Sequence, residues 1–277
     1  MGSGHQIQLS GVEMQFATPD GVVVALESTD LNVSVGEFVV LLGPSGCGKT
    51  TMLRIIGGLL KPSAGQVHVG DRNLWRGDKR DDVAVQELGI VFQEASLFPW
   101  MSIEDNIGLP LRLRGVRKGE RRREAHELCE LVGISGFEKR WPRELSGGMR
   151  QRAAIARALS YEPEILLMDE PFGSLDAMTR DQMNLELQRI WMTLGCTIVF
   201  VTHSIPEAVF LADRILLLSP RPGRIDTVLD VIFERPRNMG MLVEPEFQAI
   251  VTRLRARLEE MYWVFSASTS HGARHPR

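Results

Sequence analysis

The sequence predicts an α/β protein built on a mainly parallel sheet with helices on both faces. Short apolar segments rich in β-branched residues alternate with segments of helical spacing, and a glycine-rich loop joins one predicted strand to a helix. A long helical stretch without strand pattern then interrupts the alternation, which indicates a helical insertion into the sheet domain. The chain has 277 residues, 44% of them hydrophobic, and this is enough to bury a substantial core.

The N-terminal part contains four predicted strands and one helix. β-Branched residues and turn residues predict strands at 7–16, 22–42 (with Gly36 at a turn), 65–70 and 88–93. Between them, residues 49–60 have helical spacing, which ends at Gly57–Gly58 or at the Lys61–Pro62 break.

The middle of the chain is helical and the sheet pattern then returns. Helices are expected at 101–113, 119–133 and 148–160, then at 176–195. Strands are expected at 164–170, 196–203, 214–219 and 223–231. The last predicted element is a helix over 245–263, and we expect the polar tail 266–277 to be disordered.

Composition excludes several classes of protein. The formal net charge of −3 gives no support for a general nucleic-acid binder. The three cysteines, Cys47, Cys129 and Cys196, are far apart and form no CxxC pair, which argues against a disulfide framework or a zinc site. There is no apolar run of 18 residues and no signal-peptide pattern, so we expect a cytosolic chain that a partner holds at any membrane where it works.

The clearest motif is "GPSGCGKT", which matches GxxxxGK[ST] between a predicted strand and a predicted helix. Its glycines let backbone N–H groups surround phosphate oxygens, and the helix N-terminus adds positive charge. Lys49 is then expected to reach the β- and γ-phosphates of ATP, and the Thr50 hydroxyl to ligate Mg²⁺. Cys47 is most simply a small loop residue, although an alkylating reagent there should block nucleotide binding. The predicted nucleotide-binding residues of this segment are Gly43, Pro44, Ser45, Gly46, Cys47, Gly48, Lys49, Thr50 and Thr51.

Polar residues end three of the predicted strands. Asp169 and Glu170 follow "ILLM", and ligands bind beyond the carboxyl ends of strands in α/β sheets. We expect Asp169 to hold Mg²⁺ and Glu170 to act as general base for the water that attacks the γ-phosphate. Gln93 and His203 end two further strands, where Gln93 would orient water or Mg²⁺ and His203 would reach the γ-phosphate. The alternatives are a polar strand end for the acidic pair and a structural role for a lone histidine.

The stretch "LSGG" places Ser146, Gly147 and Gly148 before an alanine-rich helix that carries arginines. A serine hydroxyl and free N–H groups at a helix start suit an anion. The residues themselves do not say which chain holds that anion.

Taken in order, the phosphate loop, Gln93, "LSGG", "ILLMDE", "SLD" and "VTH" resemble the ATP-binding cassette ATPases, the nucleotide-binding subunits of ABC transporters. The resemblance covers residues 7–235. It implies a RecA-like P-loop NTPase core with an antiparallel β-subdomain (1–94 and 162–235) and a helical signature subdomain (95–161). The C-terminal helix and disordered tail predicted above make up the rest of the chain (236–277). The cofactors that the resemblance implies are ATP and Mg²⁺.

The same resemblance assigns roles to three further groups. It implies that Ser146, Gly147 and Gly148 bind the γ-phosphate of ATP held by a second copy of the chain, in a head-to-tail dimer with two ATP at the interface. Asp176 would lie across that interface, and Phe16 is the candidate for stacking on adenine, with a core-facing Phe16 as the alternative. Met149 departs from the commoner glutamine after "LSGG".

"GPSGCGKTT", "LFPWMSIEDNI", "LSGGMRQR" and "SPRPGRI" resemble the nitrate, sulfonate and taurine group of importer ATPases. This implies two transmembrane permease subunits, indirectly an extracytoplasmic solute-binding protein, no nucleic acid, and a peripheral place on the cytoplasmic face of the inner membrane. Phe98 and Trp100 would dock on the permease, or else pack inside the helical insertion. The basic run 112–123 would touch lipid headgroups, or else form a solvated helix face balanced by neighbouring glutamates.

Two other functions are open. The first is a soluble cassette ATPase acting on nucleic acid or ribosomes, but only 51 residues separate Gln93 from Leu145, which leaves no room for a long coiled coil, and the chain has one cassette. The second is a cassette that does not hydrolyse ATP, which the presence of Glu170 and His203 disfavours.

Overall fold

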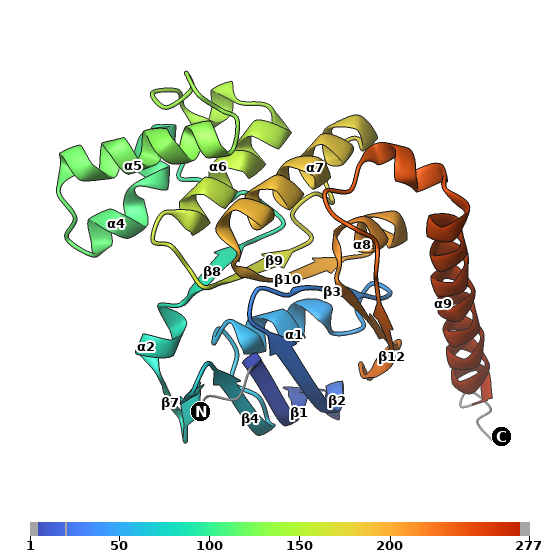
Figure 1. The fold of residues 1–277 in the computed structure, drawn as a ribbon. Helices are drawn as coiled ribbons and strands as arrows, with labels where there is room; N and C mark the ends of the chain where they lie inside the picture. Colours follow the sequence, from blue (N-terminus) through green and yellow to red (C-terminus); the bar gives the residue numbers. More distant parts are fainter. Residues whose placement is uncertain (1–4, 20, 272–277) are drawn as a thin grey trace.

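The computed structural model describes residues 5–19 and 21–271, and its centre is a six-stranded sheet (Figure 1). The strand order is β12-β11-β3-β10-β9-β8, and all neighbours are parallel except β12, which is antiparallel to β11. β3, β9 and β10 are buried along their whole length, as expected for strands covered on both faces. The strands are β3 (Phe38–Leu42), β8 (Leu88–Val91), β9 (Ile165–Asp169), β10 (Thr197–Thr202), β11 (Arg214–Leu218) and β12 (Ile225–Asp230).

A second, antiparallel sheet has the order β2-β1-β4-β5. Its strands are β1 (His5–Thr18), β2 (Gly21–Ser34), β4 (Ala64–Val69) and β5 (Arg72–Asn73). Helix α1 (Lys49–Ile56) packs between the two sheets and contacts β2 and β4 on one side and β9 and β10 on the other. A small hairpin of β6 (Trp75–Arg76) and β7 (Lys79–Arg80) and the short helix α2 (Asp82–Val85) lead to β8.

The predicted helical insertion is confirmed. It consists of α3 (Ile103–Ile107), α4 (Leu109–Leu113), α5 (Lys118–Leu131), the 3₁₀ helix η1 (Pro142–Glu144) and α6 (Gly147–Leu159). Figure 1 shows these elements above the edge of the main sheet, and α6 returns the chain to it by packing against β8.

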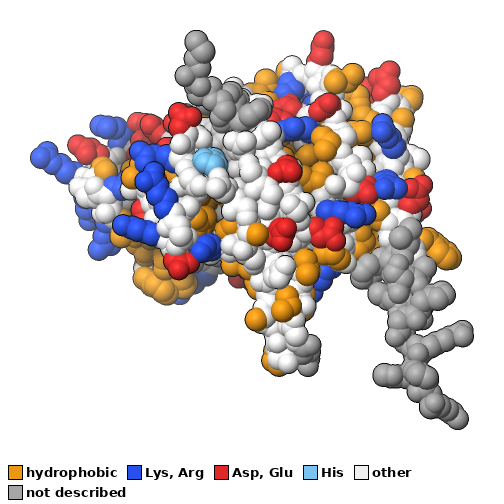
Figure 2. All heavy atoms as spheres, turned by 90° about the horizontal axis from the view of Figure 1, so that it is seen from below, with side chains coloured by type: hydrophobic (Ala, Val, Ile, Leu, Met, Phe, Trp, Pro, Cys, Tyr) orange, Lys and Arg blue, Asp and Glu red, His pale blue; other side chains and the backbone are white. Residues whose placement is uncertain are grey.

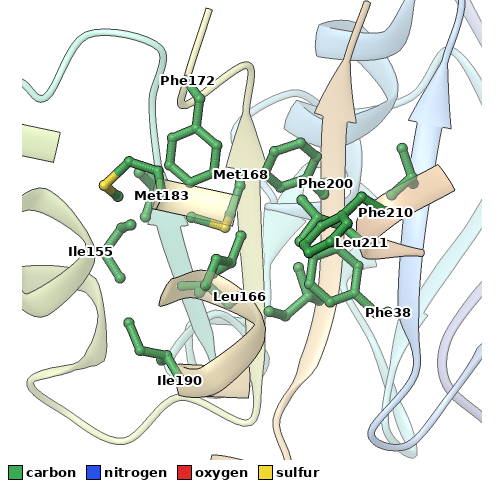
Figure 3. Close-up of a cluster of buried hydrophobic side chains, with 14 of the residues drawn as sticks. Phe38, Ile155, Leu166, Met168, Phe172, Met183, Ile190, Phe200, Phe210 and Leu211 are labelled. Atoms are coloured by element: carbon green, nitrogen blue, oxygen red, sulfur yellow. The ribbon is translucent and has the colours of Figure 1, made fainter. Parts of the chain in front are cut away.

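Helices α7 (Ala177–Leu194) and α8 (Ile205–Leu211) cover the face of the main sheet opposite α1. Figure 3 shows the aromatic core beneath them, where the ring centroids of Phe172 and Phe200 lie 5.8 Å apart. The sequence did not predict α8, which is only seven residues long and begins after the cap Ser204 with Pro206 in its first turn.

The C-terminal region begins with the 3₁₀ helix η2 (Met239–Val243) and ends with α9 (Pro245–His271). This helix continues past Trp263, so residues 266–271 of the expected disordered tail are helical, and 272–277 lie outside the described residues. Arg257 pairs with Asp226 of β12 at 2.7 Å and ties α9 to the sheet. None of the helices in the described part has the length and apolar character to cross a membrane. On the face seen in Figure 2, Lys and Arg side chains are interspersed with Asp and Glu.

Candidate active site

The glycine-rich loop Gly43–Gly48 links β3 to α1 with the geometry of a phosphate-binding loop. Gly48 caps α1 in the left-handed region, at φ 103°. A Cβ atom there would lie 2.6 Å from Leu26 Cδ2 and 3.0 Å from the Ala25 carbonyl oxygen of β2, so glycine is required for steric reasons as well. The N–H groups in the first turn of α1 have no partner within the helix, so an anion at this helix start can accept hydrogen bonds from them.

Lys49 is buried inside this loop although it is charged. Its ammonium group donates to the carbonyl oxygens of Gly43 and Pro44, each at 2.9 Å, and lies 4.0 Å from Glu170 Oε1. These contacts offset the free-energy cost of burying the charge and hold the ammonium group between the loop carbonyls and Glu170. Of the other predicted loop residues, Ser45 and Gly46 are exposed, whereas Cys47 is buried.

Cys47 is a poorer target for alkylation than the sequence suggested. It is 1% exposed, and burial raises the pKa of its thiol in spite of the nearby Lys49 charge. Because the thiolate is the reactive form, both effects slow reaction with an alkylating reagent.

Thr50 and Asp169 meet where the two halves of the site join. The Thr50 hydroxyl donates to Asp169 Oδ1 at 2.8 Å. Asp169 ends β9, and burial raises the pKa of its carboxyl group, while the hydrogen bond from Thr50 opposes that shift. A hydroxyl and a carboxylate oxygen are ligands that Mg²⁺ prefers, with substrate phosphates completing its shell, so these two residues fit the predicted ion.

Glu170 and His203, which the sequence placed at the ends of two predicted strands, lie beside each other. Glu170 Oε2 lies 3.1 Å from His203 Nδ1, and the Glu170 amide donates to the Val201 carbonyl of β10 at 3.0 Å. Glu170 itself adopts φ +43°, an unusual conformation for a residue other than glycine. The pairing of β9 with β10 thus brings the general-base candidate to the histidine, and both side chains remain partly open to solvent.

Gln93 lies at the same edge of the sheet, two residues beyond the end of β8. A Cβ atom at Gly173 would lie 3.6 Å from Gln93 Nε2 and 3.7 Å from Glu170 Oε2, so the amide and the carboxylate approach the same point. The structure therefore brings Lys49, Thr50, Asp169, Glu170, His203 and Gln93 together.

The predicted anion site at Ser146 lies apart from this group. Ser146 caps α6 and its hydroxyl accepts from the Met149 amide at 3.3 Å, with Gly147 and Gly148 in the first turn. Between the described residues, no hydrogen bond or ion pair joins Ser146–Gly148 to the phosphate loop. A Cβ atom at Gly148 would lie 2.7 Å from Thr179 Cγ2, so the start of α6 abuts the start of α7 instead.

Asp176 serves locally as the cap of α7. Its carboxylate accepts from the Thr179 hydroxyl at 2.7 Å and from the Thr179 amide at 3.0 Å, and these hydrogen bonds lower its pKa.

Phe16 lies on β1 opposite Val23, and its 39% exposure rules out the alternative of a core-facing ring. Because Ala25 and Leu26 of the paired strand touch Gly48, the exposed ring lies on the strand pair that flanks the phosphate loop.

Phe98 and Trp100 form an exposed aromatic pair in the segment after Gln93. They are 37% and 68% exposed, with ring centroids 5.3 Å apart, so the alternative in which both pack inside the insertion is wrong. The buried Asn106 side chain fixes this segment by accepting from the Phe98 amide at 2.7 Å and donating to the Phe98 carbonyl at 3.1 Å.

In the basic run, Arg122 pairs with Glu104 at 3.1 Å and Arg123 lies 3.8 Å from Glu127, as expected of a helix face balanced by glutamates.

The structure adds residues that sequence reasoning missed. Glu207 of α8 and Arg180 of α7 contact the segments that carry His203 and Glu170. Both lie close in sequence to predicted residues, but neither belongs to a motif that the sequence made visible.

Comparisons with known proteins agree with the fold and with the motif order. The family described as ABC transporter matches residues 26–173. The nitrate import ATP-binding protein NrtD of Synechocystis is 42% identical over 248 residues, covering 87% of this chain and 90% of NrtD. The taurine import ATP-binding protein TauB of Escherichia coli O157:H7 is 41% identical over 246 residues, covering 87% and 94%. The dimeric ATP-binding cassette MJ0796 bound to ADP and Pi superposes with a TM-score of 0.73 at 34% identity, over 82% of this chain and 100% of that one.

Proposed function

The chain belongs to the ABC transporter family, and from this we propose that it is the ATP-hydrolysing subunit of an importer for a small anionic solute. The cargo class is that of the nitrate, sulfonate and taurine importers, and the similarity to NrtD and TauB supports it. The chain works at the cytoplasmic face of the inner membrane, bound to two permease subunits that receive cargo from an extracytoplasmic binding protein.

The observation that carries this proposal is the contact of Glu170 with His203 beside Lys49, at 3.1 Å and 4.0 Å. Glu170 accepts a proton from a water molecule as the water oxygen forms a bond to the γ-phosphorus. The bond from that phosphorus to the ADP oxygen breaks, and Lys49 and His203 stabilise the negative charge on the γ-phosphate oxygens.

Thr50, Asp169 and Gln93 are the residues that would hold Mg²⁺. When bound, the ion would offset the negative charge of the ATP phosphates. The hydrogen bond between Thr50 and Asp169 places two of these oxygen ligands 2.8 Å apart at the start of α1.

A head-to-tail dimer completes each site. The separation of Ser146–Gly148 from the phosphate loop of the same chain supports this arrangement, because a second copy can present its α6 start to the ATP held by the first. Asp176 then lies near the interface, since it begins α7 next to the start of α6. MJ0796, which has the same fold, is described as a dimer.

The first test is the Glu170→Gln variant. We expect ATP turnover to fall by about 10²–10⁴-fold with ATP binding retained, because the amide cannot accept the proton from water. Glu259→Gln, an exposed substitution on α9, is the matched control and should keep the wild-type rate. Wild-type turnover in Glu170→Gln would remove Glu170 from the role of general base.

The second test identifies the partner. Tagged Glu170→Gln with Mg·ATP should capture polytopic membrane proteins from native membranes, and the same bait without nucleotide should capture fewer. Capture of nucleic acid or ribosomes in place of membrane proteins would overturn the importer and leave a soluble cassette ATPase.

A further inference from the structure

Glu207 holds the chain on both sides of His203. One oxygen of its carboxyl group, Oε2, accepts a hydrogen bond from the Thr202 hydroxyl. The same hydroxyl oxygen accepts from the Ser204 amide at 3.0 Å, and the Ser204 hydroxyl accepts from the Glu207 amide at 3.4 Å. Thr202 and Ser204 flank His203, so the Glu207 carboxyl group holds Thr202 directly, and the Thr202 hydroxyl and the Glu207 amide hold Ser204.

The other carboxyl oxygen of Glu207, Oε1, has no hydrogen-bond partner among the described residues. It belongs to a side chain that is 5% exposed and lines a cavity of about 190 Å³ between α7, α8 and η2. Asn184 lines the same cavity, and its Oδ1 is also buried and lacks a partner in that part of the chain. Glu207 Oε1 and Asn184 Oδ1 are thus two buried acceptors at one cavity without a donor from the described residues. A proton on Oε1 supplies such a donor.

The surroundings of Glu207 shift the pKa of its carboxyl group in both directions. Burial raises the pKa of its carboxyl group to about 7, although the Thr202 hydrogen bond and the charges of Arg180 and His203 lower it; Glu170 adds to the rise. Asp181 is the other titratable residue of α7 at the cavity, and the η2 residues that line it are Met239 and Leu242. The carboxyl group therefore changes its charge near neutral pH.

We propose that Glu207 is a positioning residue that holds His203 against Glu170 as a neutral carboxylic acid. This inference rests on the role proposed above for His203. A proton on Oε1 leaves Oε2 free to accept from Thr202, so the neutral form keeps the contact that fixes the loop.

Loss of the proton from Glu207 also affects the segment between Glu170 and Asp176. The Arg180 side chain also lines the cavity, and it donates to the carbonyl oxygens of Phe172 at 3.4 Å and Leu175 at 2.8 Å. These carbonyls lie in the segment that joins Glu170 to Asp176. An ionised Glu207 attracts Arg180 away from them, so the segment that carries the general base loosens as the pH rises.

The test measures steady-state ATP turnover of the full chain from pH 6 to pH 9. Wild-type kcat should fall with an apparent midpoint near 7, and Glu207→Gln should lose this step, because a glutamine amide keeps the acceptor for Thr202 and cannot ionise. Asp181→Asn, an exposed change at the same cavity, should keep the step. A step of unchanged midpoint in Glu207→Gln would overturn the inference.

Thr202→Val tests the hydrogen bond itself. We expect kcat to fall by about 10–100-fold with KM for ATP changed by less than about threefold, because a small displacement of a catalytic group lowers kcat more than binding. Thr202→Ser restores the hydroxyl and should recover most of the rate. Fluorescent-nucleotide binding and circular dichroism show that each variant is folded.

His203→Ala separates the two proposals. A wild-type rate in His203→Ala would overturn both the proposed role of His203 and this inference. A wild-type rate in Thr202→Val together with an inactive His203→Ala would overturn this inference alone.

Discussion

Replacing Glu207 by glutamine should change how the stability of the protein depends on pH. Burial raises the pKa of this carboxyl group from 4.5 to about 7 in the folded chain. Between these two values the folded state binds more protons than the unfolded state, so the free energy of unfolding falls as the pH rises through this window. Below pH 4.5 the Glu207 carboxyl group is neutral in both states and does not lower the free energy of unfolding. Above about pH 7 its full reduction of the free energy of unfolding is present.

The size of the effect follows from the difference between the two pKa values. About 2.5 pH units at about 1.36 kcal/mol per unit amount to about 3 kcal/mol. Glutamine cannot ionise, so the difference in stability between Glu207→Gln and the wild type should shift by about that amount between pH 4 and pH 8, in favour of the variant at high pH. Other titrating groups are present in both proteins and cancel in the comparison.

Urea unfolding at half-unit pH intervals, followed by circular dichroism, measures this difference. Glu259→Gln serves as the control, because this glutamate is exposed on α9 and its replacement should leave the pH dependence unchanged. Parallel stability curves for the wild type and Glu207→Gln would refute the reasoning and would mean that Glu207 is solvated or paired in solution.

Three further predictions concern other parts of the molecule. Arg237 donates to five carbonyl oxygens between Val209 and Phe233, so Arg237→Met should lower the free energy of unfolding by about 3–5 kcal/mol in urea, whereas the exposed Arg255→Met should have little effect. A Cβ atom at Gly223 would lie 2.0 Å from the Cys47 carbonyl oxygen, so Gly223→Ala should displace the phosphate loop and weaken ATP binding by about tenfold or more in titrations with fluorescent nucleotide, unlike Gly119→Ala, which meets nothing within 4 Å. All three cysteines are buried and burial raises each thiol pKa, to about 12 for Cys129 and about 11 for Cys196, so mass spectrometry should find little alkylation before unfolding; rapid labelling of Cys47 would contradict its burial.

The sequence predicted the strands of the main sheet and the grouping of Asp169, Glu170 and His203 because both depend on local patterns. β3 is a continuous apolar run that leads into the phosphate loop, and β9 and β10 are mainly apolar strands with polar residues at their carboxyl ends, so parallel pairing brings Asp169, Glu170 and His203 to one edge. The phosphate loop is contiguous and needs no tertiary information.

The features that the sequence did not reveal depend on distant segments or on overridden propensity. Glu207 acquires its role because η2, more than thirty residues later, closes the cavity beside it. Helix α9 extends through a segment rich in serine and threonine, where helix propensity is weak and polar composition indicated disorder. The exposure of Phe16 depends on the twist and neighbours of its strand, which a lone aromatic cannot indicate.

Helix α6 is hydrogen-bonded to the segment on both sides of Gln93. It begins at Ser146, and further along it Gln151 donates to the Phe92 carbonyl at 3.2 Å, just before Gln93. Arg157, one and a half turns later, donates to the carbonyls of Ala95 and Ser96 at 3.0 Å and 2.7 Å, just after Gln93. The segment that carries Gln93 is thus held to α6 on both sides, and the exposed pair Phe98 and Trp100 follows it within a few residues. A displacement of Gln93 must therefore move α6, and with it the Ser146 end of this helix, or break these hydrogen bonds. Moving α6 as a body loses fewer contacts, so in the proposed ATPase dimer a displacement of Gln93 would reach both the Ser146 end of α6 and the exposed aromatic pair.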